Sequence, residues 1–131
     1  MDLRRTLAIA TGAMVGAALR WGITRLLGAD GLDAALLGVN VAGCLVLGFV
    51  AEFPRRTFTR DHRAFLGAGL CGSLTTWSTL ALETASDLRD GAYLDASSWL
   101  VLNLVVGVTA AVAGRALGRG RAGRRPSGAV R

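Results

Sequence analysis

Residues 70–83, LCGSLTTWSTLALE, combine an apolar background with a dense set of groups that bind ions. Glycine, serine or threonine occupies six of eight consecutive positions: Gly72, Ser73, Thr75, Thr76, Ser78 and Thr79. These residues weaken a helix. A broken helix frees backbone carbonyls that hold a cation, and backbone amides and hydroxyls that hold an anion. The stretch therefore predicts an ion site at a helix break between Gly72 and Thr76.

Two asparagines lie in the middle of other apolar runs, Asn40 in GVNVAG and Asn103 in WLVLNLVVG. An amide in lipid needs hydrogen-bond partners, because no water is there to supply them. Either the two side chains join helices together, or they line a polar path. Trp99 precedes Asn103 by four residues and therefore shares its helix face. Gly43 follows Asn40 by three residues, and because it has no side chain it leaves space on the helix face of Asn40.

Two charged residues flank these groups. Arg20 lies inside the first apolar run near its far end, where a charge is costly unless the side chain reaches the interface. It is either part of an electropositive vestibule that attracts anions or a structural anchor. Glu83 closes the hydroxyl-rich segment, and we expect it at the far mouth.

Membrane helices must position these groups. The chain has 131 residues, of which 52% are hydrophobic, more than the core of a soluble domain of this size would bury. Four apolar runs approach the ~20 residues that cross a bilayer: residues 3–27, 34–53, 64–82 and 98–118. The sequence predicts one all-α membrane domain over residues 1–118, with a broken third helix. Residues 119–131 form a basic, glycine-rich cytoplasmic tail that we expect to be disordered.

The basic residues are all arginines, and they are segregated. Four spans place both termini on one side of the membrane, and that side receives 12 of the 15 arginines. The opposite side receives Arg25 and Arg89 together with several aspartates. Arginine-rich loops stay in the cytoplasm, so we predict a plasma-membrane protein with both termini cytoplasmic and one fixed orientation.

Several other patterns exclude alternatives. Cys44 and Cys71 lie in apolar runs without disulfide or metal spacing, and we expect small buried hydrophobes. A lone His62 and the lack of paired carboxylates within a span argue against an enzyme. The arginines form no basic face interleaved with aromatics, which argues against nucleic-acid binding. Gly12 and Gly16 form a GxxxG pattern, which predicts close helix packing.

The stretch GLCGSLTTWSTLALE resembles the third-helix signature of the CrcB/Fluc fluoride channels, which reads close to GxxGGxTTFSTFxxE. Weaker similarities follow in the family's order in GAMVGAALRW, VNVAG and WLVLNLVVG. The resemblance implies a dimer of two four-helix subunits that lie antiparallel in membrane lipid and enclose two narrow pores. It also implies passive export of cytoplasmic fluoride ion.

The resemblance implies roles for individual residues. Gly72 and Thr75 match positions whose carbonyls, from both subunits, hold a structural sodium ion (Na+). Arg20 and Glu83 match the first-helix arginine and the acid after the motif, at the vestibule. The positions along the fluoride path are matched by Asn40, Thr76, Trp77, Ser78, Thr79, Leu80, Trp99 and Asn103.

This chain also departs from the family pattern. Trp77 and Leu80 replace the two phenylalanines of the signature, Trp99 and Asn103 replace a tyrosine and a serine, and Ser73 replaces a second glycine. We therefore expect that at least one pore made from two copies of this chain is compromised. A fixed orientation also prevents an antiparallel homodimer. The sequence thus predicts a heterodimer with a related four-helix chain of opposite arginine bias.

Two alternatives remain open from the sequence. In the first alternative, the chain is a non-conducting partner that folds and inserts its sister subunit, and Asn40→Ala should then be tolerated. A small multidrug-resistance-type exporter is the other alternative, but it needs an acidic residue in the first span. Residues 3–27 contain none, which disfavours the exporter.

Overall fold

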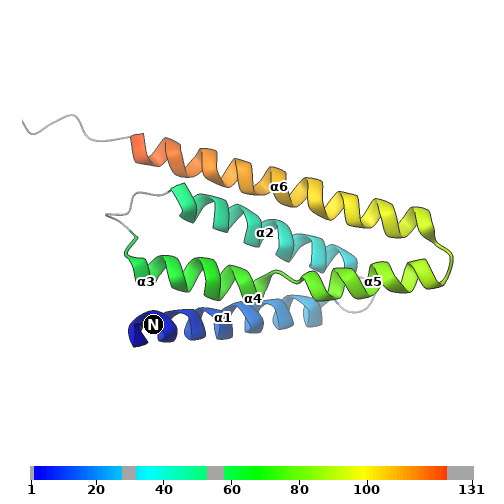
Figure 1. Ribbon diagram of the computed structural model, residues 1–131, viewed down its shortest axis with the longest axis horizontal. Helices are drawn as coiled ribbons and strands as arrows, with labels where there is room; N and C mark the ends of the chain where they lie inside the picture. Colours follow the sequence, from blue (N-terminus) through cyan, green and yellow to red (C-terminus); the bar gives the residue numbers. More distant parts are fainter. Residues whose placement is uncertain (1, 28–31, 53–57, 124–131) are drawn as a thin grey trace, which may run out of the picture.

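The computed structural model describes residues 2–27, 32–52 and 58–123, and the elements of this part are helices (Figure 1). Three are continuous: α1 (Leu3–Leu27), α2 (Leu32–Glu52) and α6 (Tyr93–Gly123). The third span is composite. It consists of α3 (Arg60–Arg63), the π-helical segment η1 (Ala64–Cys71), α4 (Gly72–Leu74) and α5 (Trp77–Arg89).

The four predicted spans are confirmed. Helices long and apolar enough to cross a membrane cover Leu3–Leu27, Asp33–Glu52, Arg60–Arg89 and Tyr93–Gly120. Many of their large apolar side chains face outward; Met14 is 72% exposed and Leu26 is 88% exposed. Such wide apolar exposure suits lipid and not water. The protein is a multi-pass helical membrane protein.

The helix of the third span runs beyond the predicted apolar stretch. The helix does not stop near Leu82 and Glu83 but continues as α5 to Arg89. Glu83 lies inside this helix, where the indole N–H of Trp99 donates a hydrogen bond to it at 3.2 Å. The sequence alone suggests that the Glu83 carboxylate ends the helix. It does not, because a neighbouring helix supplies a hydrogen-bond donor for it.

The helix of the fourth span is longer than the predicted apolar stretch at both ends. Helix α6 begins at Tyr93, directly after a turn in which Gly91 adopts a left-handed φ of +79°. It ends at Gly123, so the first five residues of the predicted disordered tail are helical. Residues 124–131 of that tail lie outside the described residues. Arg119 prolongs the helix because it pairs with Glu52 on α2.

Charge is segregated between the two ends of the bundle. The start of α1, the end of α2, the start of α3 and the end of α6 lie together at one end (Figure 1). The arginines described at this end are Arg4, Arg5, Arg60, Arg63, Arg115 and Arg119. The opposite end carries Arg25 and Arg89 with four aspartates, Asp33, Asp87, Asp90 and Asp95. The predicted separation of arginines therefore holds in the described part of the chain.

Glycines bring the helices together in two close pairs. A Cβ atom on Gly12 or Gly16 of α1 would collide with backbone carbonyls of η1. A Cβ atom on Gly48 of α2 or Gly114 of α6 would collide with the backbone of the other helix of that pair. The GxxxG pattern of α1 thus packs within one chain, against the third span.

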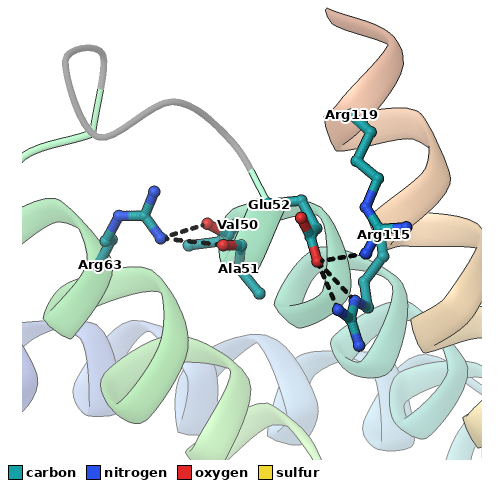
Figure 2. A network of polar contacts seen from close by, with 6 residues as sticks. All are labelled: Val50, Ala51, Glu52, Arg63, Arg115 and Arg119. Atoms are coloured by element: carbon teal, nitrogen blue, oxygen red, sulfur yellow. Dashed lines mark hydrogen bonds and ion pairs between the residues drawn. The ribbon is translucent and has the colours of Figure 1, made fainter. Parts of the chain in front are cut away.

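A polar network joins three helices at the arginine-rich end (Figure 2). The Glu52 carboxylate accepts hydrogen bonds from Arg115 Nε at 2.8 Å and from Arg119 Nη2 at 3.1 Å. Arg63 Nη1 donates to the carbonyl oxygens of Val50 at 2.9 Å and Ala51 at 3.3 Å. These carbonyls lie in the last turn of α2, which has no further helical N–H groups to bond them. Arg63 therefore caps α2 and fastens the third span to it.

We expect Arg63→Met to lower the thermal midpoint of the detergent-solubilised protein. The substitution keeps an unbranched apolar stem but removes charge-assisted hydrogen bonds worth about 1–2 kcal/mol together. Arg60→Met, in the same short helix at an exposed position, serves as the matched control. Equal midpoints for the two variants would contradict the capping role.

Candidate functional site

The break in the third span lies at Thr75 and Thr76, inside the predicted interval. Both residues are extended, with φ/ψ of −73°/153° and −140°/111°. A continuous helix would use the Thr76 N–H to bond the Gly72 carbonyl, but this N–H donates to Asn40 Oδ1 at 2.9 Å. Likewise the Thr79 N–H, which would bond the Thr75 carbonyl, donates to Thr76 Oγ1 at 3.2 Å. The break thus deprives the Gly72 and Thr75 carbonyls of their helical donors.

Those two carbonyls belong to the positions that the family resemblance matches to a sodium site. Backbone carbonyl oxygens are suitable ligands for a hard cation, and an ion site needs several of them. Cys71 differs, because its carbonyl accepts both the Thr75 N–H at 3.0 Å and the Thr75 hydroxyl at 2.9 Å. The residues present therefore fit a cation that takes part of its ligands from this chain and the rest from elsewhere.

Thr76 is the N-cap residue of α5 and lies at the centre of a cluster of hydroxyls. Its side chain caps the helix by accepting the Thr79 N–H. The Thr76 hydroxyl also lies 2.9 Å from the Thr79 hydroxyl and 3.2 Å from that of Ser78. Thr76 is only 5% exposed, whereas Ser78 is exposed. The three hydroxyls form one connected group beside the break.

We expect Thr76→Val to destabilise the protein, because valine keeps the shape but removes the cap and the centre of the hydroxyl cluster. Loss of a threonine N-cap costs about 1 kcal/mol in helices of soluble proteins. Thr76→Ser retains the hydroxyl and should keep a thermal midpoint near that of the wild type. If valine and serine variants melt together, the hydroxyl is not the stabilising group.

The half-buried Asn40 and the buried Asn103 contact each other. Asn40 Nδ2 donates to Asn103 Oδ1 at 3.4 Å, and Asn103 Nδ2 donates to the Trp99 carbonyl at 3.0 Å. Asn103 is 6% exposed, so one chain buries it without a partner subunit. Thr76 at the break is covered in the same way, at 5% exposed. Both earlier readings of the amides are compatible with this geometry: they join α2 to α6, and they line a groove.

Three open grooves contain eleven of the twelve predicted site residues. The break groove, of about 290 Å³, is lined among others by Asn40, Gly72, Thr75, Thr76, Trp77, Leu80 and Asn103. The arginine groove, of about 380 Å³, is lined by Arg20, Thr76 and Thr79 with apolar neighbours. The acidic groove, of about 730 Å³, is lined by Glu83, Trp99 and three aspartates. Ser78 lines none of these grooves and reaches the break only through its bond to Thr76.

The site residues are thus not on one continuous surface of a single chain. Thr76 alone among them lines both the break groove and the arginine groove. Trp77 is 64% exposed at the break groove, whereas Leu80 lines the same groove with only 3% of its area exposed. The pairs Glu83–Trp99 and Trp99–Asn103 connect the acidic groove to the break groove.

Some features of the site were not predicted from the sequence. The π-helical segment η1 leads into the break, and its extra residue per turn lets the Gly72 N–H reach the Gly67 carbonyl. No local pattern signals it. Cys44 and Leu104 also line the break groove. The spacing of Cys44, four residues after Asn40, was a usable signal for its place on the same helix face.

Comparisons with known proteins identify the family. The family model described as CrcB-like protein, Camphor Resistance (CrcB), matches residues 7–115. A protein of Chlorobium phaeobacteroides named "Fluoride-specific ion channel FluC" is 37% identical over 82% of this chain and 87% of its own length. Proteins with the same name from Thermococcus kodakarensis and Paracoccus denitrificans are 37% and 33% identical. They match over 91% and 87% of this chain, and over 99% and 94% of their own lengths. These names indicate a channel and not an enzyme, and the chain belongs to the CrcB/Fluc family.

Proposed function

We propose that this chain is a subunit of a fluoride channel that lets cytoplasmic fluoride leave the cell passively. The observation that carries the proposal is the set of N–H and hydroxyl donors at the break, within helices that otherwise face lipid. Fluoride is small and strongly hydrated, so a pore must replace its water with donors. Hydrogen fluoride crosses a bilayer as a neutral molecule and ionises in the cytoplasm, and a channel then releases the trapped anion.

The path that we propose follows the three grooves. Asn40, Thr76, Ser78, Thr79 and Asn103 supply donors, and the edges of Trp77 and Trp99 add weak positive charge. Leu80 supplies neither, and its burial fits a residue that shapes the groove wall. Arg20 gathers anions at one vestibule, and Glu83 lies at another. The similarity of 33–37% to channels named for fluoride supports this assignment.

A sodium ion is the second part of the proposal. The Gly72 and Thr75 carbonyls of this chain would bind it, together with the same two positions of a partner. When bound, the ion supplies positive charge near an anion path. Exchanging sodium for potassium in purified protein should then lower the thermal midpoint, and equal midpoints in both salts would contradict the site.

We further propose that the functional unit is an antiparallel dimer in the plasma membrane, and that the partner is a related chain of opposite orientation. The one-sided arginine distribution supports this, because it predicts one fixed orientation with both termini in the cytoplasm, and an inverted partner must then be a different chain. An epitope tag at the C-terminus tests the orientation. Accessibility from both sides of whole cells would favour a homodimer over a heterodimer.

A non-conducting partner subunit is the second candidate. The bulky, exposed Trp77 at the break groove is the observation that favours it. Fluoride efflux from liposomes separates the conducting role from the non-conducting role. It is measured with this chain alone, and then with this chain co-expressed with a sister chain of opposite arginine bias. We expect efflux from the pair. If Asn40→Ala in this chain leaves efflux from the pair unchanged, the non-conducting role is correct.

A further inference from the structure

We infer that Asn103 is a positioning residue that fixes the direction in which the Asn40 amide presents its N–H groups to the break groove. The inference deepens the proposed function, on which it rests. It starts from three consecutive hydrogen bonds that run from the break to α6: Thr76 N–H to Asn40, Asn40 to Asn103, and Asn103 to the Trp99 carbonyl.

The chemistry of the two ends determines the orientation of both amides. The Thr76 N–H only donates, so Asn40 must turn its oxygen toward the break. The Trp99 carbonyl only accepts, so Asn103 must turn its NH2 group toward α6. The Asn40 NH2 group and the Asn103 oxygen then face each other. No other assignment of oxygen and nitrogen satisfies both backbone groups.

Each primary amide carries two N–H groups, and the hydrogen bonds in the described part of the chain use one from each. Asn40 and Asn103 both line the break groove. One N–H of each side chain therefore remains for a ligand in the groove, while both oxygens are engaged. The two side-chain amides thus offer N–H groups while their oxygens are engaged, which favours an anion beside them.

Asn103 is suited to hold this arrangement because it cannot turn freely. It is 6% exposed and is bonded at both ends of its amide. Without it, Asn40 retains only its bond to Thr76 and can rotate about that contact. Thr109, two turns further along α6, is the matched control, since it is exposed and its hydroxyl bonds only the Val105 carbonyl of its own helix.

The composition of the chain allows a direct experiment. It contains two asparagines and no glutamine, so labelling with 15N-asparagine gives primary-amide NMR signals from Asn40 and Asn103 alone. The label is placed in the assembled channel, with an unlabelled sister chain where the pair requires one. We expect sodium fluoride, and not sodium chloride at the same concentration, to shift one proton of each NH2 pair.

Two variants separate positioning from folding. Asn103→Leu removes the amide at similar volume. Asn103→Thr keeps a hydroxyl that bonds the Trp99 carbonyl but withdraws the acceptor from Asn40. In both variants we expect the Asn40 signals to shift. We also expect the fluoride concentration that gives half of their response to rise about tenfold or more, which corresponds to about 1.4 kcal/mol of binding free energy. Thr109→Ala should leave both unchanged.

Efflux from liposomes gives a second, independent readout. If Asn103 acts partly through Asn40, Asn103→Leu lowers fluoride efflux by a larger factor in the wild-type background than in the Asn40→Ala background. The inference would be overturned if the Asn40 signals or their fluoride midpoint stayed unchanged in a folded Asn103 variant. It would also be overturned if the two substitutions lowered efflux by independent factors that multiply in the double variant. Amide signals that respond to fluoride without efflux would refute the channel and leave the positioning role standing.

Discussion

Fluoride efflux is expected to fall about 100-fold or more when Asn40 is replaced by alanine. The side chain accepts the Thr76 N–H at 2.9 Å and donates toward Asn103, so its removal affects the break and the groove together. A buried backbone N–H without a partner costs about 1–3 kcal/mol, and the groove loses a donor for the anion as well. Efflux from liposomes with equal amounts of dimer checks the result.

Asn40→Asp distinguishes the two contributions. Aspartate keeps an oxygen for the Thr76 N–H at nearly the same shape, but it has no N–H groups and brings negative charge. We expect this variant to fold with a thermal midpoint closer to the wild type than that of the alanine variant, and still to lose efflux. Efflux near the wild-type rate in either variant would contradict the role of the Asn40 donors.

The second large effect is expected at Gly48 in α2. Its Cα lies against the backbone of Ala111, so the Cβ of an alanine would collide with a carbonyl that no side-chain movement can clear. Overpacking of this kind costs about 1–3 kcal/mol or more, since two helices must separate. We expect Gly48→Ala to lower both the yield of folded protein and its thermal midpoint in detergent.

Gly38→Ala is the matched control in the same helix. A Cβ at this position has nothing within 4 Å, and alanine favours a helix over glycine by about 1 kcal/mol in soluble hosts. Its thermal midpoint should equal or exceed that of the wild type. A loss as large as that of Gly48→Ala would show that the close contact between α2 and α6 is not the cause.

Composition and charge predict most of the fold, because the stability of a helix in lipid depends mainly on how apolar its side chains are. Two helices run past the predicted apolar stretches at positions where another helix supplies a partner for a polar residue. Glu83 is tolerated within α5 because Trp99 donates to it, and Arg119 continues α6 because Glu52 binds it. Such partners are far apart in the sequence, so a rule that ends spans at polar residues stops them too early.

Part of the candidate site is predicted from the sequence, namely the position of the helix break. The density of glycine and hydroxyl residues locates the break correctly, since it depends on local backbone preference. The contact between Asn40 and Asn103 joins residues 63 positions apart, and no periodicity reveals it. The π-helical segment also escapes prediction, because Ala64–Cys71 would form an α-helix equally well on propensity.

The chain of amides from Thr76 to Trp99 has an electrical consequence. Its N–H and C=O dipoles all point the same way, so they polarise one another and their fields add. The positive end of this aligned series lies on α6, one side chain away from the carboxylate that Trp99 binds. The interior of the bundle therefore has a built-in polarity across the helices, perpendicular to the axis along which an ion would travel.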